Sequence, residues 1–206
     1  MDDWQNYYDV VLLPNPRLEA QTIQLSHQLY ELGSRWQLDR HARIPHLSLL
    51  HIPVRPSRFN DFLVEVTRAC VRSEIGKLKI NGIHVRRMHR AVFLMADKPL
   101  WLRKLYFEVI RAGLPYRDQH YAVHRRWGFL TPGMRHNVLR YGTPMVGRYF
   151  EPHVTLGTFE TDGAMDRAVK RLEAVRTYRF IPQRAAICRL GPGFTCSAPV
   201  ADIRLS

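Results

Sequence analysis

Apolar and polar residues alternate along this chain in short blocks, and the blocks predict strands and helices in regular succession. Residues 7–13 are aromatic, β-branched and aliphatic, which is typical of a strand. Asn15-Pro16 is typical of a helix start, and leucines on one helical face continue to a stop at Gly33. Further strands are expected near residues 44–51, 77–85, 91–95 and 153–159 and in two segments near the C-terminus, and further helices from Ser57 to about Cys70, over 99–112 and from a cap at Asp162 to about Leu172.

The order of these elements repeats. Strand, helix, strand, helix, strand occurs over residues 7–85 and again over about 91–190, with an insertion of roughly 35 residues before the middle strand of the second copy, a length that usually signals a functional loop. The middle strands begin Pro45-His46-Leu47-Ser48-Leu49 and Pro152-His153-Val154-Thr155-Leu156. Both run proline, histidine, aliphatic, hydroxyl, leucine, a match with a chance probability below about one per cent at ordinary residue frequencies. The chain is therefore predicted to be an internal duplication.

The repeated motif places two kinds of polar group on one face of each strand. Residues i and i+2 of a strand share a face, so His46 lies beside Ser48 and His153 beside Thr155. If a two-fold relates the copies, both polar faces line one cleft. One neutral imidazole can then take a proton while a protonated one gives a proton, and the hydroxyls can donate to phosphate oxygens. This combination suits phosphodiester chemistry without a metal.

A structural interpretation stands beside this one. A single histidine in a strand is most often a hydrogen-bonded structural residue, and threonine is common in strands. The repetition of the motif at equivalent places favours the catalytic pair. His51 lies five residues after His46, so in a regular strand it is expected to face away from the cleft.

The paired motifs His46-Leu47-Ser48-Leu49 and His153-Val154-Thr155-Leu156 resemble the signature of the 2H phosphoesterase superfamily, which includes 2′-5′ RNA ligases and cyclic phosphodiesterases. The resemblance implies a bilobal α+β fold with pseudo-two-fold symmetry, in which antiparallel-rich sheets line a central cleft and helices lie outside. One domain then covers residues 1–206, with lobes of about 1–88 and 89–206. The resemblance also implies hydrolysis of a 2′,3′-cyclic phosphate or a related nucleotide or RNA phosphodiester, with His46 and His153 as acid and base in an order left open.

The charge and the insertion indicate the class of partner. Lys and Arg number 31 against 18 Asp and Glu, for a net charge of +13, which favours anionic ligands such as RNA or nucleotides. The insertion, about residues 114–148, mixes arginines with aromatics, a combination suited to phosphate pairing and base stacking, although most such side chains simply pack a loop or face solvent. The residues predicted to bind substrate are Arg125, Arg126, Trp127, Arg148 and Tyr149.

Several classes of protein are excluded by what the sequence lacks. The hydrophobic content of 46% is that of an ordinary globular protein, and no apolar run is long enough to cross a bilayer. The acidic, polar start is unlike a secretory signal, so a cytoplasmic protein with three buried, reduced cysteines is expected. No metal-binding motif, P-loop or Gly-x-Ser-x-Gly elbow is present, so no metal or cofactor is expected.

Two alternatives to a hydrolase remain open from the sequence. A non-catalytic RNA- or nucleotide-binding protein could use the same cleft as a ligand pocket. RNA end joining to a 2′-5′ linkage needs the same residues as hydrolysis. In each case we expect a monomer that binds RNA or a nucleotide with a cyclic phosphate or 2′-5′ linkage and does not contact membranes.

Overall fold

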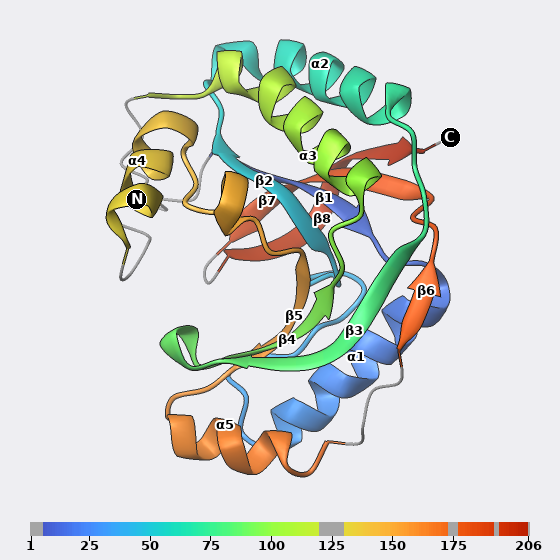
Figure 1. Ribbon diagram of the computed structural model, residues 1–206, viewed down its shortest axis with the longest axis vertical. Coiled ribbons are helices and arrows are strands. Elements are labelled where there is room, and N and C mark those ends of the chain that lie inside the picture. Colours follow the sequence, from blue (N-terminus) through green and yellow to red (C-terminus); the bar gives the residue numbers. More distant parts are fainter. Residues whose placement is uncertain (1–5, 120–129, 173–176, 192–193, 206) are drawn as a thin grey trace.

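Two antiparallel sheets form the framework of the computed structural model, which describes residues 6–119, 130–172, 177–191 and 194–205 (Figure 1). Within these residues each sheet has four strands. The first sheet contains, in spatial order, β2 (Leu47–Pro53), β1 (Tyr7–Leu13), β7 (Arg184–Gly191) and β8 (Thr195–Arg204). The second contains β5 (His153–Thr158), β4 (Ala91–Ala96), β3 (Leu78–Arg86) and β6 (Tyr178–Phe180).

Helices cover the outer faces of both sheets, as the predicted α+β fold requires (Figure 1). The helices α2 and α3 pack on the first sheet, and α1 and α5 pack on the second, while α4 stands at one side. The edge strands β2 and β5 contact each other where the sheets meet. The helices are α1 (Pro16–Glu31), α2 (Phe59–Arg72), α3 (Leu100–Gly113), α4 (Pro132–Tyr141) and α5 (Asp162–Val169).

Side-chain caps fix the starts of three helices, α1, α4 and α5. The carboxamide oxygen of Asn15 accepts a hydrogen bond from the Leu18 amide at 3.0 Å, as Asn15-Pro16 predicts. The cap of α5 differs from the expected Asp162. The hydroxyl of Thr161 accepts from the Ala164 amide at 3.2 Å, and Asp162 is the first helical residue, where its charge complements the helix dipole.

The duplication is visible in the strand order, because corresponding strands of the two copies occupy corresponding positions in the two sheets. The pair β1–β2 corresponds to β4–β5, each being a central strand followed by the motif strand at the edge. The third strand of each copy pairs in the other sheet: β3 adds to β4, and β7 adds to β1. Each sheet therefore contains strands from both copies, and the exchanged strands β3 and β7 join the two copies.

Both motif strands carry a β-bulge at the same place. In β2, Ser48 lies opposite Val11 and Leu50 opposite Val10, so Leu49 is an extra residue. In β5, the pairing across β4 skips Leu156 in the same way. A bulge shifts the alternation of faces by one residue, and this shift decides which side chains reach the site.

Part of the insertion folds as a helix. The guanidinium of Arg117 donates hydrogen bonds to the carbonyls of Val138, Leu139 and Arg140, and so caps the C-terminal end of α4. One arginine of the basic insertion therefore stabilises the fold itself.

Two expectations from the composition can be compared with the fold. Cys70, Cys188 and Cys196 are buried free thiols, as predicted. Among the described residues, no helix has the length and apolar character needed to cross a membrane.

Candidate active site

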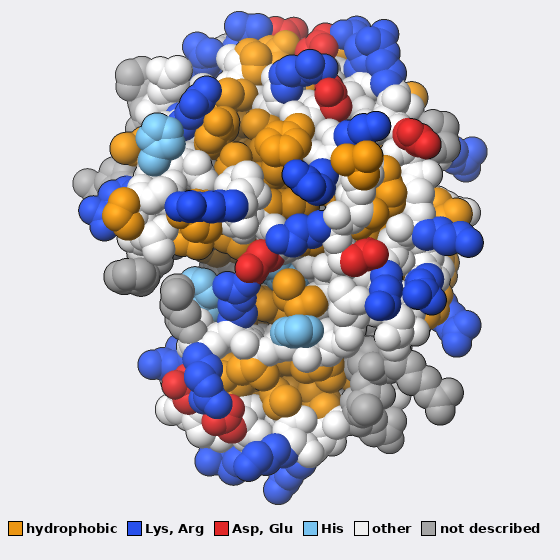
Figure 2. Space-filling model, viewed as in Figure 1, with side chains coloured by type: hydrophobic (Ala, Val, Ile, Leu, Met, Phe, Trp, Pro, Cys, Tyr) orange, Lys and Arg blue, Asp and Glu red, His pale blue; other side chains and the backbone are white. Residues whose placement is uncertain are grey.

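A cavity of about 280 Å³ lies between the two motif strands and takes its polar lining from both. In the space-filling view a hollow lies near the middle of the long axis of the molecule, with imidazole side chains beside it (Figure 2). The cavity brings together all four residues predicted to be catalytic, which are His46, Ser48, His153 and Thr155. The remaining wall is largely apolar and includes the aromatic residues Trp36, Phe93, Phe150 and Phe194.

His46 and His153 are held by the same backbone contact. Nδ1 of His46 lies 2.8 Å from the carbonyl oxygen of Ile44, and Nδ1 of His153 lies 2.7 Å from that of Glu151. A carbonyl only accepts, so each Nδ1 carries a proton and each neutral ring has its lone pair on Nε2. In both motifs the carbonyl belongs to the residue two positions before the histidine.

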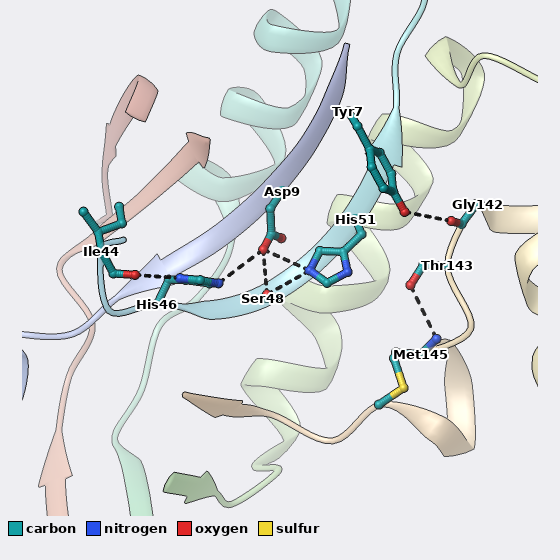
Figure 3. Close-up of polar contacts among 9 residues, drawn as sticks. All are labelled: Tyr7, Asp9, Ile44, His46, Ser48, His51, Gly142, Thr143 and Met145. Atoms are coloured by element: carbon teal, nitrogen blue, oxygen red, sulfur yellow. Dashed lines mark hydrogen bonds and ion pairs between the residues drawn. The ribbon is translucent and has the colours of Figure 1, made fainter. Parts of the chain in front are cut away.

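A buried carboxylate, Asp9 of β1, organises the first half of the site (Figure 3). Its side chain is 0% exposed. Oδ2 accepts a hydrogen bond from the Ser48 hydroxyl at 2.6 Å and lies 3.1 Å from Nε2 of His51 and 3.7 Å from Nε2 of His46. Nε2 of His51 is also 3.1 Å from the Ser48 oxygen. One carboxylate therefore contacts three polar residues of the segment that carries the first motif.

The expected orientation of His51 is wrong. A regular strand would turn His51 away from the cleft, but the bulge at Leu49 returns it to the face of His46 and Ser48, and His51 lines the cavity. Asp9 was also not singled out from the sequence. The available signal was a carboxylate in the middle of an otherwise apolar strand, where an ionisable group requires partners.

The protonation of the two histidines reflects their surroundings. Burial lowers the pKa of His46, while the nearby charge of Asp9 and the bond to Ile44 act in the opposite direction. Burial, with the charges of His46, His51 and Arg86, lowers the pKa of His153 to about 3. Both rings can therefore act as neutral bases, and only His46 has a carboxylate within 4 Å among the described residues.

The two hydroxyls differ in their partners. The Ser48 hydroxyl donates to Asp9. Within the described ranges, the hydroxyl of Thr155 makes no hydrogen bond to another protein group, although it lines the cavity. Thr155 is therefore available to a ligand.

Two of the residues predicted to bind substrate do not line the cavity. Arg148 and Tyr149 are in a short 3₁₀ turn (Gly147–Tyr149), where the guanidinium donates to the phenol oxygen at 2.8 Å, and neither lines the cavity. Arg125, Arg126 and Trp127 lie outside the described residues. Their role in binding stays a prediction.

The cationic side chains that do line the cavity were not identified from the sequence. They are Arg43 and Arg86, the latter ion-paired with Glu151. Lys and Arg are otherwise spread over the visible face (Figure 2). Among the described residues, no group of three or more His, Cys, Asp or Glu side chains is arranged to hold a metal ion.

Comparison with known proteins agrees with this architecture. The family model of the 2′-5′ RNA ligase superfamily matches residues 14–191. No curated protein sequence matches the chain. Among solved structures, TT0787 of Thermus thermophilus superposes with a TM-score of 0.59 at 15% identity, over 96% of this chain and 97% of the other. Escherichia coli LigT complexed with 3′-AMP superposes with a TM-score of 0.57 at 13% identity, over 98% of both chains.

These superpositions show a shared fold, and the family match covers most of the chain, including both histidine motifs. The resemblance drawn from the two tetrapeptides is confirmed. The chain belongs to the 2′-5′ RNA ligase superfamily, that is, to the 2H phosphoesterases.

Proposed function

We propose that this protein is a metal-independent phosphodiesterase that hydrolyses a 2′,3′-cyclic phosphate at the end of an RNA or on a nucleotide. The observation that carries the proposal is the matched pair of imidazoles, His46 and His153, each held through Nδ1 by a backbone carbonyl in one cavity. Two rings whose Nδ1 is held by the backbone keep Nε2 for proton transfer, and such a pair can serve as the acid and the base of an in-line hydrolysis.

These two imidazoles account for both proton transfers of the reaction. One neutral imidazole takes a proton from water as the water oxygen bonds to phosphorus. The bond from phosphorus to one ribose oxygen breaks, and the second imidazole, which is protonated, gives its proton to that oxygen. The product is a phosphate monoester, and the two rings return to their starting states by exchange with solvent.

The hydroxyls and the wall of the cavity supply binding. Thr155 can donate to a non-bridging oxygen of the phosphate, where charge grows in the transition state. Trp36, in the wall of the cavity, is an aromatic ring on which a base can stack. The net charge of +13 attracts a polyanion such as RNA from a distance.

Nucleotide complexes of the fold relatives support the choice of ligand. LigT has been solved with 3′-AMP and with ATP. A single chain supplies both motif strands of the cavity, β2 and β5, and this supports a single domain that acts as a monomer.

A second candidate is end joining, which the name of the family itself favours. Attack by a 5′-hydroxyl of another RNA, in place of water, on the cyclic phosphate opens the same ring and forms a phosphodiester. The proton transfers are the same, so His46 and His153 would serve both reactions. An RNA substrate that carries both a cyclic end and a 5′-hydroxyl distinguishes the two by product size.

The test is turnover of a 2′,3′-cyclic nucleotide and of a short RNA with a cyclic end, in excess EDTA. Wild type is compared with His46→Ala, His153→Ala and the control His27→Ala, an exposed residue of α1. We expect each catalytic variant to lose about a hundredfold or more in kcat, and the control to be unchanged.

Binding separates the rival interpretations. A folded wild type that binds 3′-AMP but turns over neither substrate would favour the non-catalytic binding protein. Turnover that both alanine variants retain in full would refute the assignment of the site.

A further inference from the structure

The two halves of the site match in their histidines and hydroxyls but differ at one pair of positions. Asp9 lies opposite His51 in the pairing of β1 with β2. In the pairing of β4 with β5, Ala91 lies opposite Thr158 at the same distance from the bulge. The duplicated fold therefore carries an Asp–His pair in one copy and an Ala–Thr pair in the other.

The second copy shows that the fold does not need the Asp–His pair. A strand with alanine at this position builds the same bulge, the same histidine anchor and the same hydroxyl. Burying a carboxylate is costly, and Oδ1 of Asp9 has no hydrogen-bond partner among the described residues. A buried charge that the framework can do without, placed beside two imidazoles and a hydroxyl, indicates a role in the chemistry.

The geometry gives Asp9 an unequal effect on the two histidines. Oδ2 lies 3.7 Å from Nε2 of His46, where a carboxylate stabilises the protonated ring. His153 has no carboxylate side chain at a comparable distance among the described residues, and its ring packs on Phe93 with centroids 4.2 Å apart. Burial lowers the pKa of both rings, but the charge of Asp9 is the main factor that opposes this at His46 and the weakest of those acting on His153.

The other titratable groups around the cavity sharpen this difference. Arg86 of β3 disfavours a proton on His153, although it is also paired with Glu151. His51 disfavours protonation of both rings. The remaining ionisable residues of the wall are Arg43, His89 and Cys196. Of the carboxylates that line or adjoin the cavity, only Asp9 is within 4 Å of a motif histidine in the described part of the chain.

We propose that Asp9, held by Ser48 and His51, is a positioning residue that favours a proton on His46 over one on His153, so that His46 is the general acid and His153 the general base. The inference rests on the proposed function and assigns the direction of proton flow within it. Water gives its proton to Nε2 of His153, and Nε2–H of His46 gives its proton to the leaving ribose oxygen. Asp9 takes no part in either proton transfer and touches neither the water nor the phosphate.

The decisive variants make the first copy resemble the second. They are Asp9→Asn, which removes the charge with little change in shape, Asp9→Ala, which reproduces Ala91, and His51→Thr, which reproduces Thr158. Asp202→Asn is the matched control, because Asp202 lies in the same sheet but is half exposed and paired with Arg184.

The first measurement is the pH dependence of kcat/KM on a 2′,3′-cyclic nucleotide. The alkaline limb of the profile reports the pKa of the general acid, and this pKa falls when the charge of Asp9 is removed. We expect Asp9→Asn to move the alkaline limb to lower pH by about one unit or more, with the acidic limb in place, and to cost about tenfold at a pH above that limb. Asp202→Asn should leave both limbs unchanged. An acidic limb that moves in place of the alkaline one would reverse the assignment, and a profile lowered uniformly would reduce Asp9 to a structural residue.

The second measurement does not depend on turnover. NMR titration of the imidazole C2–H signals, assigned with the His46→Ala and His153→Ala variants, gives the midpoint of each ring directly. We expect His46 to titrate above His153, and Asp9→Asn to lower the midpoint of His46 by about one unit while that of His153 changes by a few tenths. Equal shifts of the two rings, or none, would overturn the inference even if the enzyme is active. A wild type without turnover would refute the proposed function, while this titration still decides whether Asp9 holds the proton on His46.

Discussion

The hydroxyl of Ser48 donates to a buried carboxylate, Asp9 Oδ2, at 2.6 Å. Thr155, which occupies the equivalent position in the second copy, has no such partner among the described residues. The two hydroxyls occupy equivalent positions in the two motifs, but they differ in their hydrogen-bond partners. One is part of a hydrogen-bonded cluster, and the other is open to the cavity.

This difference predicts unequal effects of removing the two hydroxyls. Thr155→Val keeps the shape of the side chain but loses a donor to the phosphate, so we expect kcat to fall by about a hundredfold with little change in stability. Thr155→Ser should restore most of the rate. Ser48→Ala removes a partner from a buried carboxylate, so we expect it to cost about 1–3 kcal/mol of unfolding free energy as well as activity.

Steady-state kinetics and urea unfolding of the three variants check this prediction. Equal losses of stability in Thr155→Val and Ser48→Ala would show that the Asp9 cluster does not distinguish the two hydroxyls.

The low pKa of His153 predicts that the protein loses stability in acid. Burial lowers this pKa from 6.5 to about 3, so between these values the unfolded chain binds a proton that the folded one does not. Unfolding then takes up protons, and the free energy of unfolding decreases as the pH falls through this window. For His153 alone, the loss between pH 7 and pH 5 is about 2 kcal/mol. The lowered pKa of His46 acts in the same direction.

Urea unfolding at pH 7 and pH 5 measures this loss. His153→Gln has no ring to protonate, and its difference between the two pH values should be smaller by about 2 kcal/mol. The exposed His27→Gln should keep the wild-type difference. If His153→Gln keeps it too, His153 is not the source of the acid sensitivity.

The fold and the motif residues could be predicted because both depend on local patterns. Alternation of apolar residues marks the strands, and a five-residue match marks the duplication. The assumed two-fold predicts that His46 and His153 are neighbours, and both line the cavity between β2 and β5.

The Asp9 cluster could not be predicted, because it depends on a bulge. The extra residue at Leu49 sets the face of the strand on which His51 lies. An aliphatic stretch such as Leu49-Leu50 carries no local signal for this shift in strand pairing. The third strand of each copy also pairs with the central strand of the other copy. The order of elements along the chain does not predict this long-range pairing. Residue type and position in the chain indicate Arg148 and Tyr149 as binding residues, but they say little about where a turn directs these side chains.

The second bulge leads to a prediction about Gly157, which follows Leu156 in β5. A Cβ at this position would lie 2.5 Å from Oγ and 3.2 Å from Cβ of Ser34, a buried residue whose hydroxyl donates to the Trp36 carbonyl. Ser34 is too short to swing aside, so Gly157→Ala must push the motif strand away from the segment that follows α1. We expect a loss of about 1–3 kcal/mol in unfolding free energy and a lower kcat, since Thr155 is two residues away.

A double-mutant cycle checks the cause. Ser34→Gly alone should be destabilising by about 1 kcal/mol through the lost hydrogen bond, whereas in the Gly157→Ala background it relieves the clash and should restore stability and rate. The control is Gly163→Ala in α5, where the new Cβ would meet only an arginine tip at 3.5 Å and should change the stability by less than about 1 kcal/mol. Additive effects of Gly157→Ala and Ser34→Gly would mean that the strand tolerates a side chain at 157, and that the close approach of Ser34 does not hold the second motif in place.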